Sequence, residues 1–391
     1  MIVRDEERFL EGCLASLRGV ADEVVIADTG SRDRSREIAD RHGARVIDFP
    51  WRQDFAAARN AALDAALGSW ILYIDADERV RATDRTRLAE QLADPRLLAC
   101  TVLFRPARGY TRYREHRLFR NDPRLRFRGV IHESHLPALD ELLRQGAGIV
   151  GESDLAIDHE GYEGDLTAKH RRNRPLLEAR LRAEPDHVYA WSHLGSTLHG
   201  MGELEAARAA YQRGLAVVRA GRARVATDSL VYLGLVQLHM ELGEPLDGLL
   251  DEALAAYPDQ WTLIWVQARH LIAGGRPAAA LPLLARLTAI DPATLCTGQL
   301  AHDERIFGVH AWDAAGLCNF RLERYAESAA CYARGESCAG GRELELRTKR
   351  RLAEARARAA APLSLTGCQP AAATSPGAAT ARPGPSGPRG A

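Results

Sequence analysis

Short apolar runs alternate with helix-like patterns over the first third of the chain. The runs Val24–Ala27 and Arg45–Phe49 are short and rich in β-branched residues, so they predict strands. Phe9–Leu17 places its apolar residues on one face of a helix, and Asp54–Leu67 predicts an alanine-rich helix that ends at Gly68. This alternation of strands and helices predicts a parallel α/β sheet.

The stretch Trp70–Glu78, with the sequence WILYIDADE, combines a strand pattern with two carboxylates. Trp70–Ile74 has no polar interruption, which predicts a strand buried on both faces of the parallel sheet. Ligands of open α/β sheets bind beyond the carboxyl ends of such strands, where Asp75 and Asp77 follow. Their oxygens suit Mg²⁺ or Mn²⁺ that also binds a diphosphate. The alternative is that both residues cap the next helix.

The alternation weakens beyond Asp77 and then gives way to helices alone. Thr83–Leu92 predicts a helix and Leu98–Phe104 a strand, and the Arg-rich and aromatic segment 109–135 predicts shorter, partly antiparallel strands. Leu155–Ile157 predicts a last strand, directly before His159. The first part of the chain is therefore expected to end near residue 164.

Helical repeats are the second feature of the sequence, over residues 165–360. The first unit contains Trp191, Leu194, Gly195, Gly202, Ala207 and Tyr211, and the last contains Trp312, Ala315, Gly316, Tyr325 and Tyr332. Two less regular units lie between them, at residues 232–255 and 264–292. The small residues fall where paired helices approach closely, which favours tetratricopeptide-like repeats over a generic helical bundle. Residues 361–391 are rich in Ala, Pro and Gly and are predicted to be disordered.

Composition narrows the class of protein. The formal net charge is zero, so nothing in the charge favours a nucleic acid or an anionic membrane as a partner. The seven cysteines form no C-x-x-C pair, which is typical of free thiols in a reducing compartment. The amino terminus lacks the pattern of a signal peptide, and no apolar run reaches the roughly 20 residues that span a bilayer. We therefore expect a soluble, cytoplasmic protein.

Six motifs in order over the first 165 residues resemble those of family 2 glycosyltransferases with the GT-A fold. They are MIVRDEE (1–7), DTGSRD (28–33), DFAAARN (54–60), DADE (75–78), GVIHE (129–133) and HEGY (159–162). The combination of such a domain with helical repeats also resembles bacterial enzymes that include the peptide S-glycosyltransferases of glycosylated bacteriocins. The resemblance implies a GT-A nucleotide-diphospho-sugar domain over residues 1–164, which the repeat domain and the tail follow.

The resemblance also implies roles for individual residues. Residues expected to bind the nucleotide sugar lie in the first four motifs: Val3, Arg4, Glu6, Asp28, Arg59, Asn60 and Asp75. Asp77 is the expected main ligand of Mn²⁺ or Mg²⁺, with Asp75 and His159 as further ligands, and the ion would act as a Lewis acid on the leaving diphosphate. Glu133 is the expected general base, with Asp122 as the second candidate.

Each role has a structural alternative. Asp28 could cap the helix after Gly30, Arg59 and Asn60 could form a solvated helix face, and Glu133 could pair with Arg126 or Arg128. His159 could be a structural histidine. Tyr162 could contact the sugar or close the junction between the domains.

The sequence departs from the family pattern at two places. Asp5 stands where the family usually has Asn, and the first strand begins at Met1 although relatives usually begin several residues earlier. From the second departure we expect either that the true start lies upstream or that the domain is less stable than its relatives. Thermal melts of this chain and of an upstream-extended chain would distinguish the two.

The sequence as a whole predicts a metal-dependent, inverting glycosyltransferase with a UDP-sugar as the expected donor. Inversion is implied by the resemblance alone. The repeats would bind the acceptor, a peptide, protein or glycan, or form a homodimer. The main alternative is a non-catalytic interaction scaffold with a degenerate sugar-nucleotide domain. A nucleotidyltransferase ranks last, because such enzymes need a Gly- and Lys-rich phosphate loop and residues 4–7 are RDEE.

Overall fold

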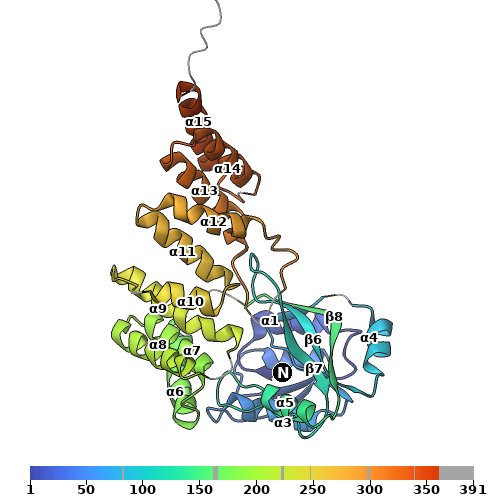
Figure 1. Ribbon diagram of the computed structural model, residues 1–391. Helices are drawn as coiled ribbons and strands as arrows, with labels where there is room; N and C mark the ends of the chain where they lie inside the picture. Colours follow the sequence, from blue (N-terminus) through green and yellow to red (C-terminus); the bar gives the residue numbers. More distant parts are fainter. Residues whose placement is uncertain are drawn as a thin grey trace, which may run out of the picture.

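The computed structural model has an α/β part, from β1 to β8, and a helical part, from α6 to α15 (Figure 1). It describes residues 1–81, 83–161, 166–221, 224–246, 248–296, 300–338 and 340–360. The predicted disorder of 361–391 and the alternatives for Tyr162 lie outside the described residues. The helices of the helical part follow one another away from the α/β part, with α6 beside it and α15 at the far end (Figure 1).

The first sheet is parallel, as the alternation predicts. Its strands lie in the order β1-β2-β3, with Val3 paired to Asp28 and Asp28 to Asp48. The elements of this region are β1 (Ile2–Val3), α1 (Glu7–Ser16), β2 (Val25–Asp28), α2 (Ser35–Arg41), β3 (Arg45–Asp48) and α3 (Phe55–Ala65). Leu10, Cys13 and Leu14 of α1 are buried, which confirms the apolar face predicted there.

The second sheet is mixed, with the strand order β4-β7-β6-β8-β5. Its strands are antiparallel to their neighbours except for β6 and β8, which are parallel. The elements of this region are β4 (Trp70–Leu72), β5 (Glu78–Val80), α4 (Arg85–Leu92), β6 (Leu97–Arg105), β7 (Tyr113–Arg120), α5 (Leu136–Arg144) and β8 (Ile149–His159). The sequence patterns predicted α4, β6 and the antiparallel β7 but missed β5 and α5.

Two expectations about this region are wrong. The strand expected at Trp70–Ile74 is only β4, which is half-buried and pairs antiparallel with β7 at the edge of the mixed sheet. The Arg120 guanidinium lies 4.3 Å from the centroid of the Trp70 ring, so a charged side chain covers part of β4. Gly68 does not cap α3, because α3 ends at Ala65 and Ala66 continues in an extended conformation.

The helical part consists of antiparallel pairs that confirm the predicted repeats. Its helices are α6 (Thr167–Ala183), α7 (Val188–Gly200), α8 (Leu204–Arg219), α9 (Ser229–Leu242), α10 (Leu249–Ala256), α11 (Trp261–Ala273), α12 (Pro277–Thr288), α13 (Val309–Arg321), α14 (Tyr325–Ser337) and α15 (Glu343–Ala360), with short 3-10 turns at Ala226–Asp228 and Glu304–Ile306. A Cβ at Gly195 or Gly234 would overlap the Tyr211 ring, and one at Gly316 would overlap the Tyr332 ring. The glycines therefore let the paired helices pack against tyrosine rings.

The helical part also packs against the α/β part. Ile131, from the loop after β7, is 4% exposed and belongs to the same apolar cluster as residues of α6 and α7. Farther along, the Thr111 amide donates to the His302 carbonyl, the His302 amide donates to the Thr111 hydroxyl, and Tyr110 pairs with Asp303. Within the described ranges, no helix combines the length and the apolar character that crossing a membrane requires.

Candidate active site

Two loops at the carboxyl edge of the first sheet are tied together by Asp5. Its φ angle is 56°, in the left-handed region that Asn and Asp enter more readily than other side chains. The Asp5 carboxylate accepts a hydrogen bond from the Arg32 backbone at 2.7 Å, and the Asp5 amide donates to Ser31 Oγ at 3.1 Å. Asp5 therefore supplies the acceptor oxygen and the conformation that an Asn would supply there.

Asp28 serves the turn that follows β2. Its carboxylate is 3% exposed and accepts hydrogen bonds from the Ser31 amide at 3.0 Å and the Ser31 hydroxyl at 2.6 Å. The second oxygen accepts from Arg36 at 2.9 Å. Asp28 thus supports the turn after β2 but does not cap the next helix, α2, whose N-cap is Arg34, and contact with a nucleotide stays a prediction.

Arg59 is the centre of the charged group at the end of β4. Its guanidinium lies 2.8 Å from a Glu133 oxygen and 3.3 Å from an Asp75 oxygen. Its planar faces lie over Tyr73 and Phe127, with centroid distances of 4.9 and 5.2 Å. Arg59 is therefore buried and paired with two carboxylates, unlike the solvated helix face that was the alternative.

The charges around Asp75 keep this group ionised. Burial works against its charge, but the cations Arg59 and Arg117 outweigh burial, so the pKa of Asp75 is lowered. The carboxylates of Asp75 and Glu133 hold the pKa of Arg59 above its ordinary value, although burial acts to lower it. Glu133 pairs with Arg59 and not with Arg126, which binds Asp64 at 2.8 Å.

Asn60 binds the backbone of Phe127. Its amide oxygen accepts from the Phe127 backbone N–H and its amide nitrogen donates to the Phe127 carbonyl, both at 2.9 Å. These two bonds fix the backbone of the chain shortly before Gly129. Asn60 is therefore not part of a solvated helix face, and its contact with a nucleotide stays a prediction.

Asp77 lies in the turn between β4 and β5, and it contacts His159, the last residue of β8. Asp77 Oδ2 lies 3.1 Å from His159 Nε2, and His159 Nδ1 lies 2.8 Å from the Pro106 carbonyl. A hydrogen bond from Nδ1 to a carbonyl leaves Nε2 as the ligand atom, the arrangement common in metal-binding histidines. A Cβ at Gly161 would overlap both His159 and Asp77. The glycine thus lets the chain pass close to this pair.

Neighbouring carboxylates make this edge electronegative. Burial raises the pKa of Glu6 to about 7, and repulsion from Asp77, Asp75 and Asp33 adds to it. A cation that binds between these groups would relieve this repulsion. Among the described residues, no group of three or more His, Cys, Asp or Glu side chains could hold a metal by themselves. The residues therefore fit a divalent ion held by Asp77 and His159 and completed by the oxygens of a diphosphate.

The sequence reasoning missed Arg172, which α6 brings to this edge. Burial lowers its pKa, repulsion from Arg4 lowers it further, and attraction to Glu6 acts in the opposite direction. Its guanidinium lies 5.5 Å from the centroid of the Phe55 ring. Arg4, an exposed residue that the motifs did suggest, and Arg172 thus form a cationic pair beside the carboxylates.

Asp122, the second candidate for the base, lies elsewhere. Arg124 binds both of its carboxylate oxygens, at 3.0 and 2.6 Å. The adjacent Asn121 amide bonds to Ser69, before the start of β4, whereas Asp75 follows the end of that strand. The structure does not bring Asp122 to the group around Arg59.

Val3 supports the carboxyl edge of the first sheet through its carbonyl, which accepts a hydrogen bond from the Thr29 amide at 2.9 Å.

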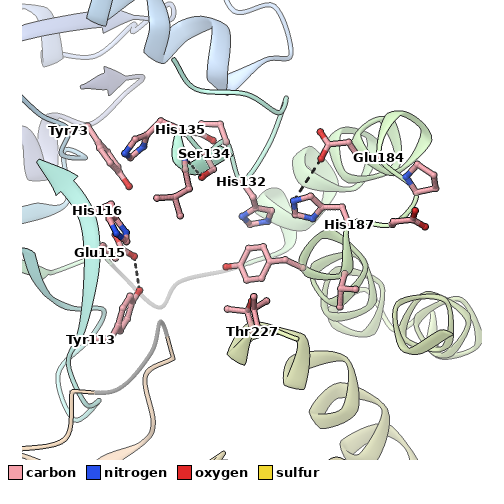
Figure 2. A pocket seen from close by; sticks show the side chains of 17 residues that line it. Tyr73, Tyr113, Glu115, His116, His132, Ser134, His135, Glu184, His187 and Thr227 are labelled. Carbon is pink, nitrogen blue, oxygen red and sulfur yellow. Dashed lines mark hydrogen bonds and ion pairs between the residues drawn. The ribbon is translucent and has the colours of Figure 1, made fainter. Parts of the chain in front are cut away.

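A pocket of about 630 Å³ opens next to Glu133, between the two parts of the protein. Figure 2 shows Tyr73, His116 and Tyr113 of the α/β part on one wall, and His187 and Thr227 of the helical part on the other. Four carboxylates line it: Glu115, Glu133, Glu184 and Asp186. The described residues that line the pocket include no lysine or arginine.

Two of the pocket histidines, His132 and His135, are uncharged near neutral pH. Burial lowers the pKa of His132 to about 2 and that of His135 to about 3, and repulsion from neighbouring cations and histidines adds to both shifts. Together with three tyrosines, they give the walls hydrogen-bonding groups without positive charge.

Comparisons with known proteins identify a glycosyltransferase family model and two relatives. The family model "Glycosyl transferase family 2" matches residues 1–145. The chain is 38% identical over 283 residues to a TPR repeat-containing protein of Synechococcus elongatus, and the match covers 69% of each chain. It is 27% identical over 214 residues to the SPbeta prophage-derived glycosyltransferase SunS of Bacillus subtilis, covering 51% of this chain and 48% of that one. The chain thus matches about half the length of SunS.

Among solved structures, glucosyl-3-phosphoglycerate synthase from Mycobacterium tuberculosis is similar with a TM-score of 0.34 and 16% identity, over 46% of this chain and 77% of that one. The family assignment rests on the sequence matches and on the α/β and helical parts described above. From these, the chain contains a family 2 glycosyltransferase domain, matched over residues 1–145, and belongs to the same family as the TPR repeat-containing protein of Synechococcus elongatus.

Proposed function

We propose that the protein transfers a sugar, with inversion, from a UDP-sugar to an acceptor that enters the pocket beside Glu133. Residues 1–164 form the transferase domain in this proposal, and residues 165–360 the helical domain. The observation that carries the proposal is the position of Arg59. Its guanidinium contacts Asp75, on the donor side, and Glu133, on the pocket side. The donor and acceptor sides of a transferase site therefore meet at one buried cation.

The transfer follows from these positions. The acceptor's O–H or S–H group attacks the anomeric carbon, the bond from that carbon to the diphosphate breaks, and Glu133 accepts the acceptor's proton. Asp77 and His159 would hold a divalent ion, which supplies Lewis-acid stabilisation of the leaving diphosphate. Arg4 and Arg172 would bind further diphosphate oxygens. Arg59 pairs with the Glu133 carboxylate and fixes its orientation.

The pocket also restricts the acceptor. Carboxylates without a lysine or arginine among the described lining residues disfavour an anionic acceptor, so we propose an uncharged or cationic one. Peptides that differ only in Lys, Gln or Glu beside one Ser or Cys would test this. The Lys and Gln peptides should stimulate nucleotide release, and stimulation by the Glu peptide alone would contradict the assignment.

The experiment that tests the function is nucleotide release from UDP-, GDP- and dTDP-sugars with Mn²⁺, Mg²⁺ or a chelator. We expect slow hydrolysis of a UDP-sugar that depends on the metal, falls at least 100-fold in Asp77→Asn and falls in Glu133→Gln. Asp122→Asn is the matched control and should retain the rate. If no donor is hydrolysed or bound, the alternative of a non-catalytic interaction scaffold is favoured.

The helical part would then bind part of the acceptor or form a homodimer. Light scattering of the purified protein separates these, because a stable dimer doubles the measured mass at micromolar concentration.

A further inference from the structure

The loop that carries Glu133 packs against helices of the helical part. This loop, Gly129–Glu133, is called the base loop below. Its Ile131 side chain is 4% exposed and belongs to the apolar cluster that contains Leu177 of α6 and Val188 of α7. The His132 ring lies 4.1 Å, between centroids, from the His193 ring of α7. The α/β part therefore supplies the base residue, and the helical part supplies a surface against which its loop packs.

Arg180 of α6 fixes the backbone of the base loop. Its side chain is 6% exposed, and one guanidinium nitrogen donates hydrogen bonds to the carbonyls of Ile131 and, at 2.7 Å, His132. These carbonyls immediately precede Glu133. A second guanidinium nitrogen lies 3.0 Å from His187 and 3.5 Å from Glu184, which hold the cation in place.

The base loop needs such support because its backbone is strained. His132 has a φ angle of 50°, a left-handed conformation that is unfavourable for a residue with a Cβ. Gly129 has a φ angle of 99°. A Cβ at this position would overlap the Arg180 guanidinium, so the glycine makes room for the arginine. Such conformations persist only where surrounding contacts determine them.

We propose that Arg180 is a positioning residue that holds the base loop, so that the first helices of the helical part complete the active site. This proposal rests on the proposed function, in which Glu133 is the base. Glu133 is then held from two sides: Arg59 of α3 orients its carboxylate, and Arg180 of α6 orients its backbone. Arg180 does not touch Asp75, Asp77 or His159, so its loss should affect turnover and not donor binding.

The first experiment compares Arg180→Gln and Arg180→Lys with Arg182→Gln. Arg182 is the matched control, because it lies on the same helix and is exposed. For hydrolysis of the UDP-sugar with Mn²⁺, we expect kcat to fall at least 10-fold in Arg180→Gln, with KM unchanged within twofold. Arg180→Lys should recover part of kcat, because an ammonium group can still donate to one of the two carbonyls. A folded Arg180→Gln protein with the kcat of wild type would overturn the proposal.

The second experiment separates this proposal from the function on which it rests. Hydrogen–deuterium exchange of residues 128–135 measures how firmly the base loop is held, whether or not any sugar is hydrolysed. We expect at least 10-fold faster exchange in both Arg180 variants than in Arg182→Gln, with α13 and α14 unchanged. Absence of hydrolysis in wild type would count against the proposed function alone, whereas unchanged exchange in the base loop would overturn the role of Arg180. Variants whose α13 and α14 also exchange faster are globally destabilised, and Arg180→Lys, the milder change, then decides.

Discussion

The two junctions between the α/β part and the helical part differ in how they are built. At the first junction the base loop buries Ile131 among apolar residues of α6 and α7, and Arg180 binds its carbonyls. At the second junction the chain around Thr111 pairs with the chain around His302 through backbone hydrogen bonds. Thr111 N donates to the His302 carbonyl at 2.9 Å, and Glu304 N donates to the Gly109 carbonyl at 2.8 Å.

The difference separates a junction that depends on particular side chains from one that depends mainly on backbone pairing. Backbone hydrogen bonds form with almost any side chain, so the second junction can join the parts without constraining their chemistry. The first junction needs a glycine, a buried arginine and an apolar residue in three defined positions. It also lies directly beside Glu133, so perturbing it should alter catalysis, whereas perturbing the second should alter stability alone.

The largest effect is expected for Gly129→Ala at the first junction. The alanine would have to adopt a φ angle of 99°, and its Cβ would have to displace Arg180. Strain and overpacking together should lower the free energy of unfolding by about 4 kcal/mol. We expect hydrolysis of the UDP-sugar to be nearly abolished and the urea midpoint to fall. Gly109→Ala, which also has a positive φ angle but nothing near its Cβ, is the control. Equal loss of activity in both variants would contradict the special role of Gly129.

A smaller loss is expected for Ile131→Ala. Removing most of a fully packed side chain from the helical core should cost about 3 kcal/mol and loosen the base loop. Turnover should fall together with stability, which urea unfolding and donor hydrolysis measure in parallel. Ile149→Ala serves as control, because Ile149 is 46% exposed and should be nearly neutral in both assays. A stability loss without any change in turnover would mean that the base loop tolerates movement.

Acidification should weaken the first junction next. Burial lowers the pKa of His132 to about 2 and of His193 to about 4, so both are neutral in the folded protein and bind protons more readily when unfolded. The stability that these neutral histidines contribute is therefore fully present above the pKa of an unfolded histidine, and it is lost as the pH falls below that value. Between pH 7 and 5 the loss should be about 2 kcal/mol per buried histidine at most.

Urea unfolding at pH 7 and pH 5 checks this sign and its location. His193→Gln should reduce the stability loss between the two pH values, and His270→Gln, at an exposed position, should not. His302 at the second junction also has a pKa lowered to about 4 by burial, so part of the loss should remain. A protein that becomes more stable at pH 5 would contradict the assignment of neutral histidines.

The smallest effect is expected for Thr111→Val at the second junction. The substitution keeps the β-branched shape but removes the hydroxyl that accepts from the His302 amide at 2.9 Å. The unpaired buried N–H should cost about 1 kcal/mol, measured by urea unfolding. Hydrolysis of the UDP-sugar should remain at the wild-type rate, and a clear fall in kcat would show that the second junction also controls the site.

The sequence by itself determined most elements and several of the chemical groups. The apolar periodicity of Phe9–Leu17 and of the repeats is a local property, so it predicted α1 and the close approach of paired helices at small residues. Asp75, Asp77 and His159 were found because each follows a strand, and strand ends meet at one edge of a sheet. Local pattern failed for β4, because pairing with β7 and cover by Arg120 depend on residues some 50 positions away.

Only the tertiary structure decided which charges meet and which way the side chains face. Arg59 binds Glu133, which lies 74 positions away, and Arg180 reaches the base loop from 48 positions away. Arg172 and Arg180 carried no signal in the sequence, because arginines on a helix are usually solvated and α6 has several of them. Asn60 was assigned to the nucleotide, yet it holds the Phe127 backbone, because the docking of α3 sets its direction. Periodicity fixes how a segment folds, whereas the packing of segments distant in the sequence fixes the electrostatics of the site.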